Sequence, residues 1–369
     1  MLQKFLLFLS FLLLTSITLM AQQKAMKIGV VGLTHTHVHW ILGREDRGDI
    51  TIVGIVETNQ DLAKRYTAQH GLSMDLVYNS LEAMIAATQP EAVVAFGTIY
   101  EHLAVVESCA PKGIHVMVEK PLAVSMDHAR KMAALAKKHQ IHLLTNYETS
   151  WHPTTHEAYA VLKSGTVGEL RKVVVRDGHK GPKKIGVNQE FLDWLTDPVQ
   201  NGGGALMDFG CYGVNLMTWL QQGKRPNSVT AITQQLQPEN NPKVEDEAVI
   251  ILTYNSAQAV IQASWNWPIG RKDMEIYGLK GVIYADDRHK LRLRLAEGYD
   301  GYQEEARTLQ EREAPYDDPF ALFAAVVRKD VVLQPFDLSS LENNLLVMEI
   351  LDAARKSAET QKTVKLKQK

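Results

Sequence analysis

The sequence contains few cysteines and has no excess of charge of either sign. Cys109 and Cys211 are the only cysteines in 369 residues, which is too few for a disulfide framework. The 40 basic and 42 acidic residues leave a formal net charge of −2, which gives no basic surface for nucleic acid or an anionic membrane. With 45 % hydrophobic and 22 % charged residues, the composition is that of a globular protein. A chain of this length can hold two domains with full cores.

A long apolar run occurs only at the N-terminus. Lys4 precedes an apolar stretch at residues 5–14 that is broken only by Ser10, and Ala21 is followed by polar residues. This pattern predicts a secretory signal peptide at residues 1–21, and therefore a secreted, periplasmic protein. An uncleaved anchor is the alternative, but the run is short for a membrane helix, so we expect no stable membrane insertion after cleavage. A tightly bound cofactor would then be acquired outside the cytoplasm.

Short apolar strands alternate with helical patterns over residues 26–150. This alternation predicts a Rossmann domain with a doubly wound parallel sheet. The expected strands are near residues 27–32, 50–57, 76–78, 92–96, 113–119 and 141–145.

Longer strands of alternating character follow, and they predict a second α/β domain at residues 151–338 with a large, mainly antiparallel open sheet. Its helix at residues 206–220 is introduced by three glycines, and a final amphipathic helix is expected within residues 339–360. The expected strands are at residues 171–176, 228–236, 249–254, 257–265, 273–277, 281–285 and 291–295.

The turn after the first strand is where a dinucleotide would place its pyrophosphate. A glycine-rich fingerprint requires G-x-G-x-x-G there, but the sequence is GLTHTH from Gly32, so only the first glycine is kept. Backbone amides at a helix N-terminus can still bind phosphate. The side chains of Thr34, His35 and Thr36 add donors, so these residues and Gly32 are candidate cofactor ligands.

Glu57 ends the second strand, 25 residues beyond Gly32. An acid at about this distance hydrogen-bonds the adenine ribose diol, and its charge repels a 2′-phosphate. Thr58 and Asn59 supply no cation to offset that charge, so the sequence favours NAD over NADP. The alternative is an acid that simply marks the end of a strand.

His35, His37 and His39 raise the question of a metal site, because residues 35 and 39 are one helical turn apart. Zinc sites usually need three or four ligands and a supporting second shell. No acidic residue lies at a helical spacing within this cluster, so we expect no metal.

Lys120 ends a short apolar strand and is followed by Pro121, which restricts the lysine backbone to extended geometry. Ligands of open parallel sheets bind beyond the carboxyl ends of the strands, so Lys120 is expected to face a cleft. The alternative is a solvated Glu119–Lys120 charge pair before a turn.

Asp208 and Tyr212 are spaced i, i+4, and Asn215 follows three residues later, so on one helix the three share a face. An alcohol that loses hydride must also lose its hydroxyl proton, which requires a base or relay. Tyrosine has an ordinary pKa near 10, too high unless a cation stabilises its phenolate. Lys120 would be that cation if the two domains close over one cleft. The alternative is a structural helix whose polar face meets solvent.

The segments GIHVMVEKPL at residues 113–122 and GGGALMDFGCY at residues 202–212 resemble the glucose–fructose oxidoreductase/inositol dehydrogenase (Gfo/Idh/MocA) family. The resemblance extends over nearly all of residues 26–360. It implies that Lys120, between Glu119 and Pro121, contacts the nicotinamide ribose and the substrate. It also implies that Tyr212 is the acid/base and Asp208 the motif aspartate. Finally, it implies that the last helix packs back on the first domain and that the open sheet forms the interface of a homo-oligomer, a dimer or tetramer.

The sequence departs from the family in two further segments. Thr98 and Ile99 replace the Pro-Asn that precedes the motif histidine, here His102, which alters the nicotinamide pocket. The stretch at residues 146–151 lacks the arginine found in glucose–fructose oxidoreductase, so substrate contacts should differ. Trp151 and Trp194 are candidate stacking faces for a sugar ring, and Asn215 is a third candidate substrate contact.

We therefore expect an NAD(P)-dependent oxidoreductase with a tightly bound cofactor. It would transfer hydride to or from a small carbohydrate: a sugar, polyol, sugar acid or glycoside. Two alternatives remain. One is a redox-neutral NAD-dependent glycoside hydrolase or lyase; the other is a cofactor-free carbohydrate-binding protein of the same fold.

Overall fold

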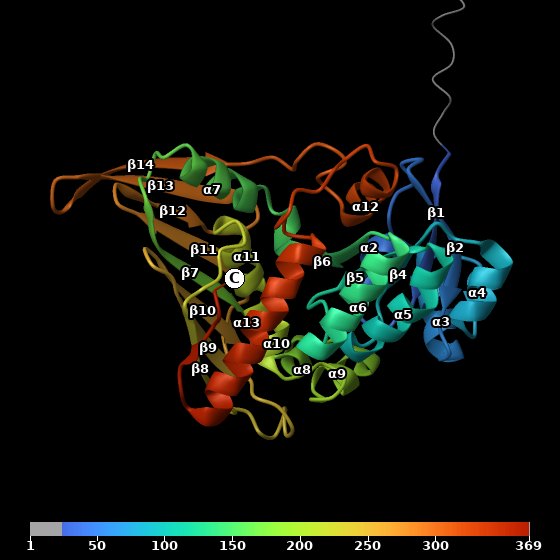
Figure 1. The fold of residues 1–369 in the computed structure, drawn as a ribbon. Coiled ribbons are helices and arrows are strands. Elements are labelled where there is room, and N and C mark those ends of the chain that lie inside the picture. The colour runs from blue at the N-terminus through green and yellow to red at the C-terminus, as the bar shows by residue number, and fades with distance from the viewer. Residues whose placement is uncertain (1–23, 369) are drawn as a thin grey trace, which may run out of the picture.

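The computed structural model describes residues 24–368, and two β-sheets stand side by side with helix α13 (Leu341–Thr360) between them (Figure 1). The signal peptide predicted at residues 1–21 lies outside the described residues. Within residues 24–368, no helix combines the length and apolar character needed to cross a membrane.

The first sheet, sheet A, has six parallel strands in the order β3-β2-β1-β4-β5-β6. This confirms the predicted Rossmann-like topology, which follows from strands such as β4 that are buried on both faces. The strands are β1 (Met26–Val31), β2 (Ile50–Val56), β3 (Val77–Tyr78), β4 (Ala92–Ala95), β5 (His115–Glu119) and β6 (Leu143–Asn146).

Helices join these strands, and the side chains of Asn59, Ser80 and Ser125 cap three of them at their N-termini. The helices are α2 (Val38–Leu42), α3 (Gln60–His70), α4 (Leu81–Thr88), α5 (His102–Cys109) and α6 (Met126–His139), with short 3₁₀ turns η1 (Met74–Leu76), η2 (Ile99–Glu101), η3 (Ala110–Lys112) and η4 (Glu148–Trp151). The first of these helices, α2, begins only at Val38. The backbone N–H of His35 donates instead to Phe96 O, at 2.8 Å, which holds the turn open.

The second sheet, sheet B, has nine strands in the order β14-β13-β12-β11-β7-β10-β9-β8-β15. Only the β7–β10 pair is parallel among the pairs of this sheet in the described chain, so the predicted mainly antiparallel sheet is confirmed. The strands are β7 (Leu170–Gly178), β8 (Ser228–Gln234), β9 (Glu247–Thr253), β10 (Gln258–Ser264), β11 (Arg271–Gly278), β12 (Gly281–Ala285), β13 (Lys290–Glu297), β14 (Gly301–Thr308) and β15 (Val364–Lys365).

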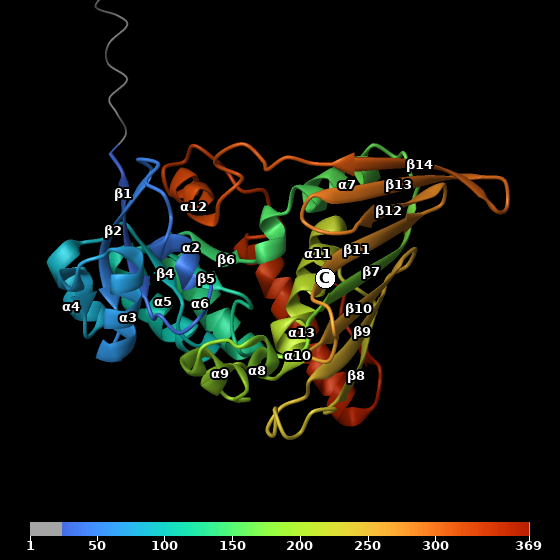
Figure 2. The ribbon, with the colours of Figure 1, turned by 180° about the vertical axis from the view of Figure 1, so that it is seen from behind.

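Helices α7, α10, α11 and α13 pack on one face of sheet B, whereas α12 packs on β2 of sheet A (Figure 2). The helices of this part are α7 (Pro153–Lys163), α8 (Pro182–Ile185), α9 (Gln189–Leu195), α10 (Ala205–Asp208), α11 (Gly210–Leu220) and α12 (Pro319–Val327). The final helix, α13, contacts α6 and β6 on one side and α11 and β8 on the other.

The helix predicted at residues 206–220 is divided in two at Phe209. The backbone N–H of Tyr212 donates to Phe209 O, at 3.1 Å, rather than to Asp208 O, four residues earlier. The Asp208 carbonyl instead accepts from Lys120 Nζ, at 3.2 Å. The insertion of a side chain into the helical hydrogen-bond ladder therefore breaks the helix at the site that the sequence analysis singled out.

Candidate active site

Lys120 and Asp208 form a buried ion pair between the end of β5 and the end of α10. The ammonium group donates to Asp208 Oδ1, and Trp265 Nε1 donates to Asp208 Oδ2 at 3.0 Å. Burial alone would lower the pKa of Lys120, but the adjacent Asp208 charge raises it above its ordinary value. Burial would likewise raise the pKa of Asp208, and the Lys120 charge lowers it. Both groups are therefore charged at neutral pH.

Tyr212 lies beside this pair, so the structure brings together residues 120, 208 and 212 from two parts of the chain. Lys120 Nζ is 5.2 Å from the centroid of the Tyr212 ring. Burial, followed by the charge of Glu148, raises the pKa of Tyr212 well above its ordinary value. The sequence analysis expected Lys120 to stabilise a phenolate; in the structure, burial and the acidic neighbours outweigh the cation, and the phenol keeps its proton.

A second ion pair, between Lys272 of β11 and Glu148 of η4, also lies at Tyr212. Lys272 Nζ is 4.6 Å from the centroid of the Tyr212 ring and bonds to Glu148 Oε2. Sequence reasoning did not identify this pair. Glu148 could have been found, because it follows the carboxyl end of β6. The sequence around Lys272 contains no motif. The alternation of buried and exposed residues along β11 indicates only that Lys272 lies on the helix-covered face of the strand.

The first turn retains two features of a dinucleotide site. Gly32 has φ +76°, and a Cβ there would lie 2.6 Å from Gly97 N, so only glycine fits. Glu57 is buried at the end of β2 and accepts hydrogen bonds from the amides of Leu33 (3.0 Å) and Asn59 (2.8 Å). The structure therefore holds a carboxylate where an adenine ribose would bind.

The rest of the turn uses its donors internally. The amide of His35 donates to Phe96 O at 2.8 Å, and the amide of His37 donates to His35 Nδ1 at 3.1 Å. The hydroxyl of Thr34 is 3.4 Å from Phe96 O, and the carbonyl of Thr36 accepts from His39 N at 3.3 Å. Fewer amides are left for phosphate than in a glycine-rich turn.

The two tryptophans expected to stack on a sugar have other surroundings. Trp194 of α9 donates to Thr34 Oγ1 at 3.0 Å and packs with Phe191 against His35, so it covers the first turn. Trp151 is buried in the core beside sheet A and donates to Asn146 Oδ1 at 2.9 Å. Trp151 is therefore a core residue, and Trp194 lies on the cofactor side.

Glu119 joins His35 and His37, with one ligand-type atom of each within 4.8 Å of the others, an arrangement that the sequence spacing did not predict. His35 Nδ1 accepts a hydrogen bond from the His37 amide, and burial lowers the pKa of His35 well below its ordinary value. The neutral ring then carries its proton on Nε2, the nitrogen that faces Glu119. Both oxygens of Glu119 have hydrogen-bond partners, His37 Nδ1 at 3.0 Å and Asn146 Nδ2 at 2.7 Å.

Two other predicted residues, Thr98 and His102, hold local structure. Thr98 forms a capping box with Glu101 at η2. His102 Nδ1 is 3.1 Å from Leu122 O, just after Pro121 in the chain, and its buried Nε2 has no partner in the described part of the chain. If Nδ1 carries the proton, Nε2 is a free acceptor.

Asn215 does not reach Lys120 or Tyr212. Its side chain is fully buried and donates to Leu338 O at 2.8 Å and to Asn344 Oδ1 at 3.4 Å. In place of the substrate contact expected for it, Asn215 joins α11 to α13.

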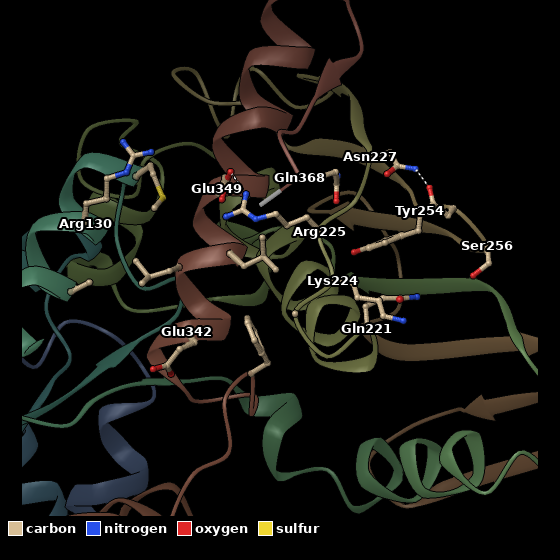
Figure 3. Close-up of a pocket in the computed structure, with 17 residues that line it drawn as sticks. Arg130, Gln221, Lys224, Arg225, Asn227, Tyr254, Ser256, Glu342, Glu349 and Gln368 are labelled. Carbon is tan, nitrogen blue, oxygen red and sulfur yellow. Dashed lines mark hydrogen bonds and ion pairs between the residues drawn. The ribbon is translucent and has the colours of Figure 1, made fainter.

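A cavity of about 870 Å³ opens elsewhere, between α6, α13 and the turn after α11 (Figure 3). Arg225 and Glu349 form an ion pair in it, and Asn227 donates to Asn255 at 2.8 Å. Its lining includes none of the residues predicted for the site. Lys120, Asp208 and Tyr212 instead lie together at the junction of the two sheets.

Two sequence families match the chain. Residues 26–147 match the oxidoreductase family with an NAD-binding Rossmann fold, and residues 155–284 match the GFO/IDH/MocA C-terminal domain. The chain belongs to the Gfo/Idh/MocA family. The chain is similar to the trans-1,2-dihydrobenzene-1,2-diol dehydrogenase of Xenopus tropicalis, 28 % identical over 240 residues (64 % of this chain, 67 % of the relative). The human dehydrogenase of the same name is 27 % identical over 234 residues (62 % and 65 %).

Solved structures show the same fold. The aldose-aldose oxidoreductase of Caulobacter crescentus, complexed with glycerol, aligns with a TM-score of 0.76 and 21 % identity, over 93 % of this chain and all of that one. An inositol dehydrogenase homolog from Azotobacter vinelandii, complexed with NAD+, aligns with a TM-score of 0.81 and 17 % identity, over 93 % and 98 %. The chain is thus an enzyme-family member with a nicotinamide-binding fold.

Replacing Asp208 alone should destabilise the protein more than replacing both partners. Asp208→Asn leaves the Lys120 ammonium buried and unpaired, which costs about 3–5 kcal/mol, whereas Lys120→Met/Asp208→Asn removes that charge. Urea unfolding at neutral pH measures both. Glu169→Gln, at an exposed pair with Arg171, is the control and should stay close to wild type. A double variant no more stable than Asp208→Asn would contradict the prediction.

Glu119 should make stability depend on pH in acid. Burial would raise the pKa of Glu119, but His37 and the Asn146 hydrogen bond lower it from 4.5 to about 2. A depressed folded-state pKa stabilises the protein above pH 4.5 and loses that contribution as pH falls towards 2. Glu119→Gln should flatten the unfolding free energy in this window. Glu107→Gln, on the exposed face of α5, should keep the wild-type slope, and equal slopes in both variants would refute the assignment.

Proposed function

We propose that this protein is an NAD(P)-dependent oxidoreductase that transfers hydride between nicotinamide and a hydroxyl or carbonyl carbon of a carbohydrate. The observation that supports this most is the meeting of Lys120, Asp208 and Tyr212 at the junction of the two sheets. It supplies a fixed cation and a phenolic proton in one buried place.

A bound nicotinamide would supply the hydride acceptor or donor at this junction. Lys120 stabilises negative charge on the reacting oxygen, and Asp208 keeps the lysine charged and oriented. Tyr212 donates its proton to the alkoxide during reduction and is left as a phenolate; in oxidation, the reverse step, that phenolate takes the hydroxyl proton. Because its pKa is raised, the resting phenol keeps its proton, which is the form that the reduction direction requires.

Gly32, Glu57 and the free acceptor His102 Nε2 fit a dinucleotide. Glu57 would hold the adenine ribose and repel a 2′-phosphate, which favours NAD over NADP. Thr34 and the amides of the first turn would hold the pyrophosphate. Trp194 and Phe191, packed over this turn, support slow exchange and thus a tightly bound cofactor.

The cofactor-free binding protein is the second candidate function. The internal hydrogen bonds of the first turn favour it, because the amides of residues 33, 35 and 37 already have acceptors. Export through the predicted signal peptide would suit either candidate. A homo-oligomer could form through the face of sheet B that carries exposed Ile232.

Tyr212→Phe should abolish turnover without unfolding the protein. Its hydroxyl has no hydrogen-bond partner within residues 24–368, so its loss should leave the melting temperature near that of wild type. Turnover should fall by about 10²–10⁴-fold because the proton donor is gone. Tyr147→Phe, which changes a neighbouring ring 5.4 Å away, is the matched control. Full activity of Tyr212→Phe would remove the proposed acid/base.

Native mass spectrometry should find a dinucleotide mass on the exported protein. Added NAD should bind more tightly than NADP, and Glu57→Gln should reduce this preference because the repelling charge is lost. Calorimetry with each cofactor measures the ratio. A protein that carries no dinucleotide and binds neither cofactor would point to the cofactor-free binder.

A further inference from the structure

Tyr212 is flanked by two ammonium groups, and each has a carboxylate partner. Lys120 Nζ and Lys272 Nζ lie 5.2 Å and 4.6 Å from the ring centroid. Asp208 is bound to the first and Glu148 to the second. In the described chain, the ion pairs thus leave no unpaired lysine at the ring.

Further acidic groups surround this arrangement. Glu119 immediately precedes Lys120 in the sequence, and its carboxylate is hydrogen-bonded to His37 Nδ1 (3.0 Å) and Asn146 Nδ2 (2.7 Å). Asp177 of β7 is directly paired in register with Lys272 of β11. Both residues lie on the helix-covered face, as the burial of the alternate residues Val175 and Met274 shows.

Asp177 has an unusual environment. Its side chain is buried, and neither carboxyl oxygen has a hydrogen-bond partner within the described residues. Lys272, its register neighbour, bonds to Glu148 instead. Burial raises the pKa of Asp177 well above its ordinary value, which favours the uncharged form of this carboxyl. It is a positioning group beneath Lys272, next to a small cavity that it lines with His152.

The groups that remain free are hydrogen-bonding groups. The Lys272 ammonium has three N–H donors, of which Glu148 takes one. Glu148 itself stays about one-third exposed and can accept further hydrogen bonds. The phenol of Tyr212 has no partner within residues 24–368. A molecule with adjacent hydroxyl groups can both donate and accept hydrogen bonds, so it matches the Lys272 ammonium, the Glu148 carboxylate and the Tyr212 phenol.

An anionic substrate fits poorly. Its carboxylate would have to displace Glu148 from Lys272 or lie among the carboxylates of residues 119, 148 and 208, where like charges repel. We propose that Lys272, held by Glu148, binds a hydroxyl oxygen of a neutral polyhydroxylated substrate beside Tyr212, and that the balanced charge rejects the corresponding sugar acid. This inference rests on the proposed oxidoreductase function and narrows its substrate class.

The test compares probes that differ only at C6, where the acid has a carboxylate in place of the neutral sugar's hydroxymethyl group: methyl α-D-glucopyranoside with its uronate, and D-galactose with D-galacturonate. Calorimetry measures binding to the protein with its cofactor, and nicotinamide absorbance measures turnover separately. We expect each neutral probe to bind about tenfold or more tightly than its acid. Lys272→Met should weaken binding of the neutral probes by a similar factor, because it removes the donor.

Glu148→Gln is the decisive variant. It leaves Lys272 without its carboxylate, so the preference for the neutral probe should shrink by about tenfold or reverse. Glu275→Gln is the matched control: it makes the same change of residue in β11, the strand of Lys272, but on the opposite face, where Glu275 binds Arg176 at 2.7 Å, and it should leave the ratio unchanged. Melting temperatures show that each variant is folded.

The outcomes separate this inference from the proposed function. Tighter binding of the acids by wild type, an unchanged ratio in Glu148→Gln, or no binding of either neutral probe would each overturn the inference. Turnover of acids alone would leave the oxidoreductase standing and the inference refuted. The expected binding ratios without nicotinamide reduction would support neutral recognition and refute the oxidoreductase.

Discussion

The ion pair of Lys120 and Asp208 is the constraint on which the site depends. Two buried charges are tolerated only when each is paired and its remaining hydrogen-bonding capacity is filled. Here the Asp208 carboxylate accepts hydrogen bonds from Lys120 and Trp265, and Lys120 also donates to the Asp208 carbonyl. These residues come from β5, α10 and the end of β10, so forming the pair fixes sheet A against sheet B.

The three glycines before α10 make this approach possible. A Cβ on Gly202 would lie 2.8 Å from Val124 O, and a Cβ on Gly204 would collide with the Glu245 carbonyl. The chain therefore runs close to the loop after Lys120 on one side and to sheet B on the other. The family motif has a local physical role here: it lets the aspartate reach the lysine, and the broken helix after it gives the lysine a second acceptor.

Sequence reasoning recovered what depends on continuous apolar strands and on motif spacing. The parallel Rossmann topology of sheet A and the meeting of residues 120, 208 and 212 followed from these signals. Elements without such signals were missed. Edge strand β14 has almost wholly exposed side chains and no apolar alternation, and α12 is buried nearly all round, so neither shows the period of an amphipathic element.

The site residues that were missed have a common cause. Lys272 and Asp177 meet Glu148 only through the register of β7 and β11 and the packing of η4, and no sequence spacing encodes either. The helix break at Phe209 was missed because it depends on Lys120, 88 residues earlier in the chain. Local rules fail where a distant side chain replaces a local hydrogen bond, and such places are often functional.

In the turn after β1, hydrogen bonds within the protein occupy backbone amides that a glycine-rich turn would offer to phosphate. In a glycine-rich turn the backbone amides are free to bind phosphate. Here His35 lies in the turn, and its ring accepts a hydrogen bond from the His37 amide. Phosphate must compete with bonds already formed, so the pyrophosphate contributes less affinity than in a glycine-rich turn. In the proposed mode of binding, a dinucleotide would depend more on Glu57 at the adenine end, on Lys120 and His102 at the nicotinamide end, and on α9 over the turn. Because α9 belongs to the second part of the chain, binding of a dinucleotide would be coupled to the contact between the two sheets that Lys120 and Asp208 fix.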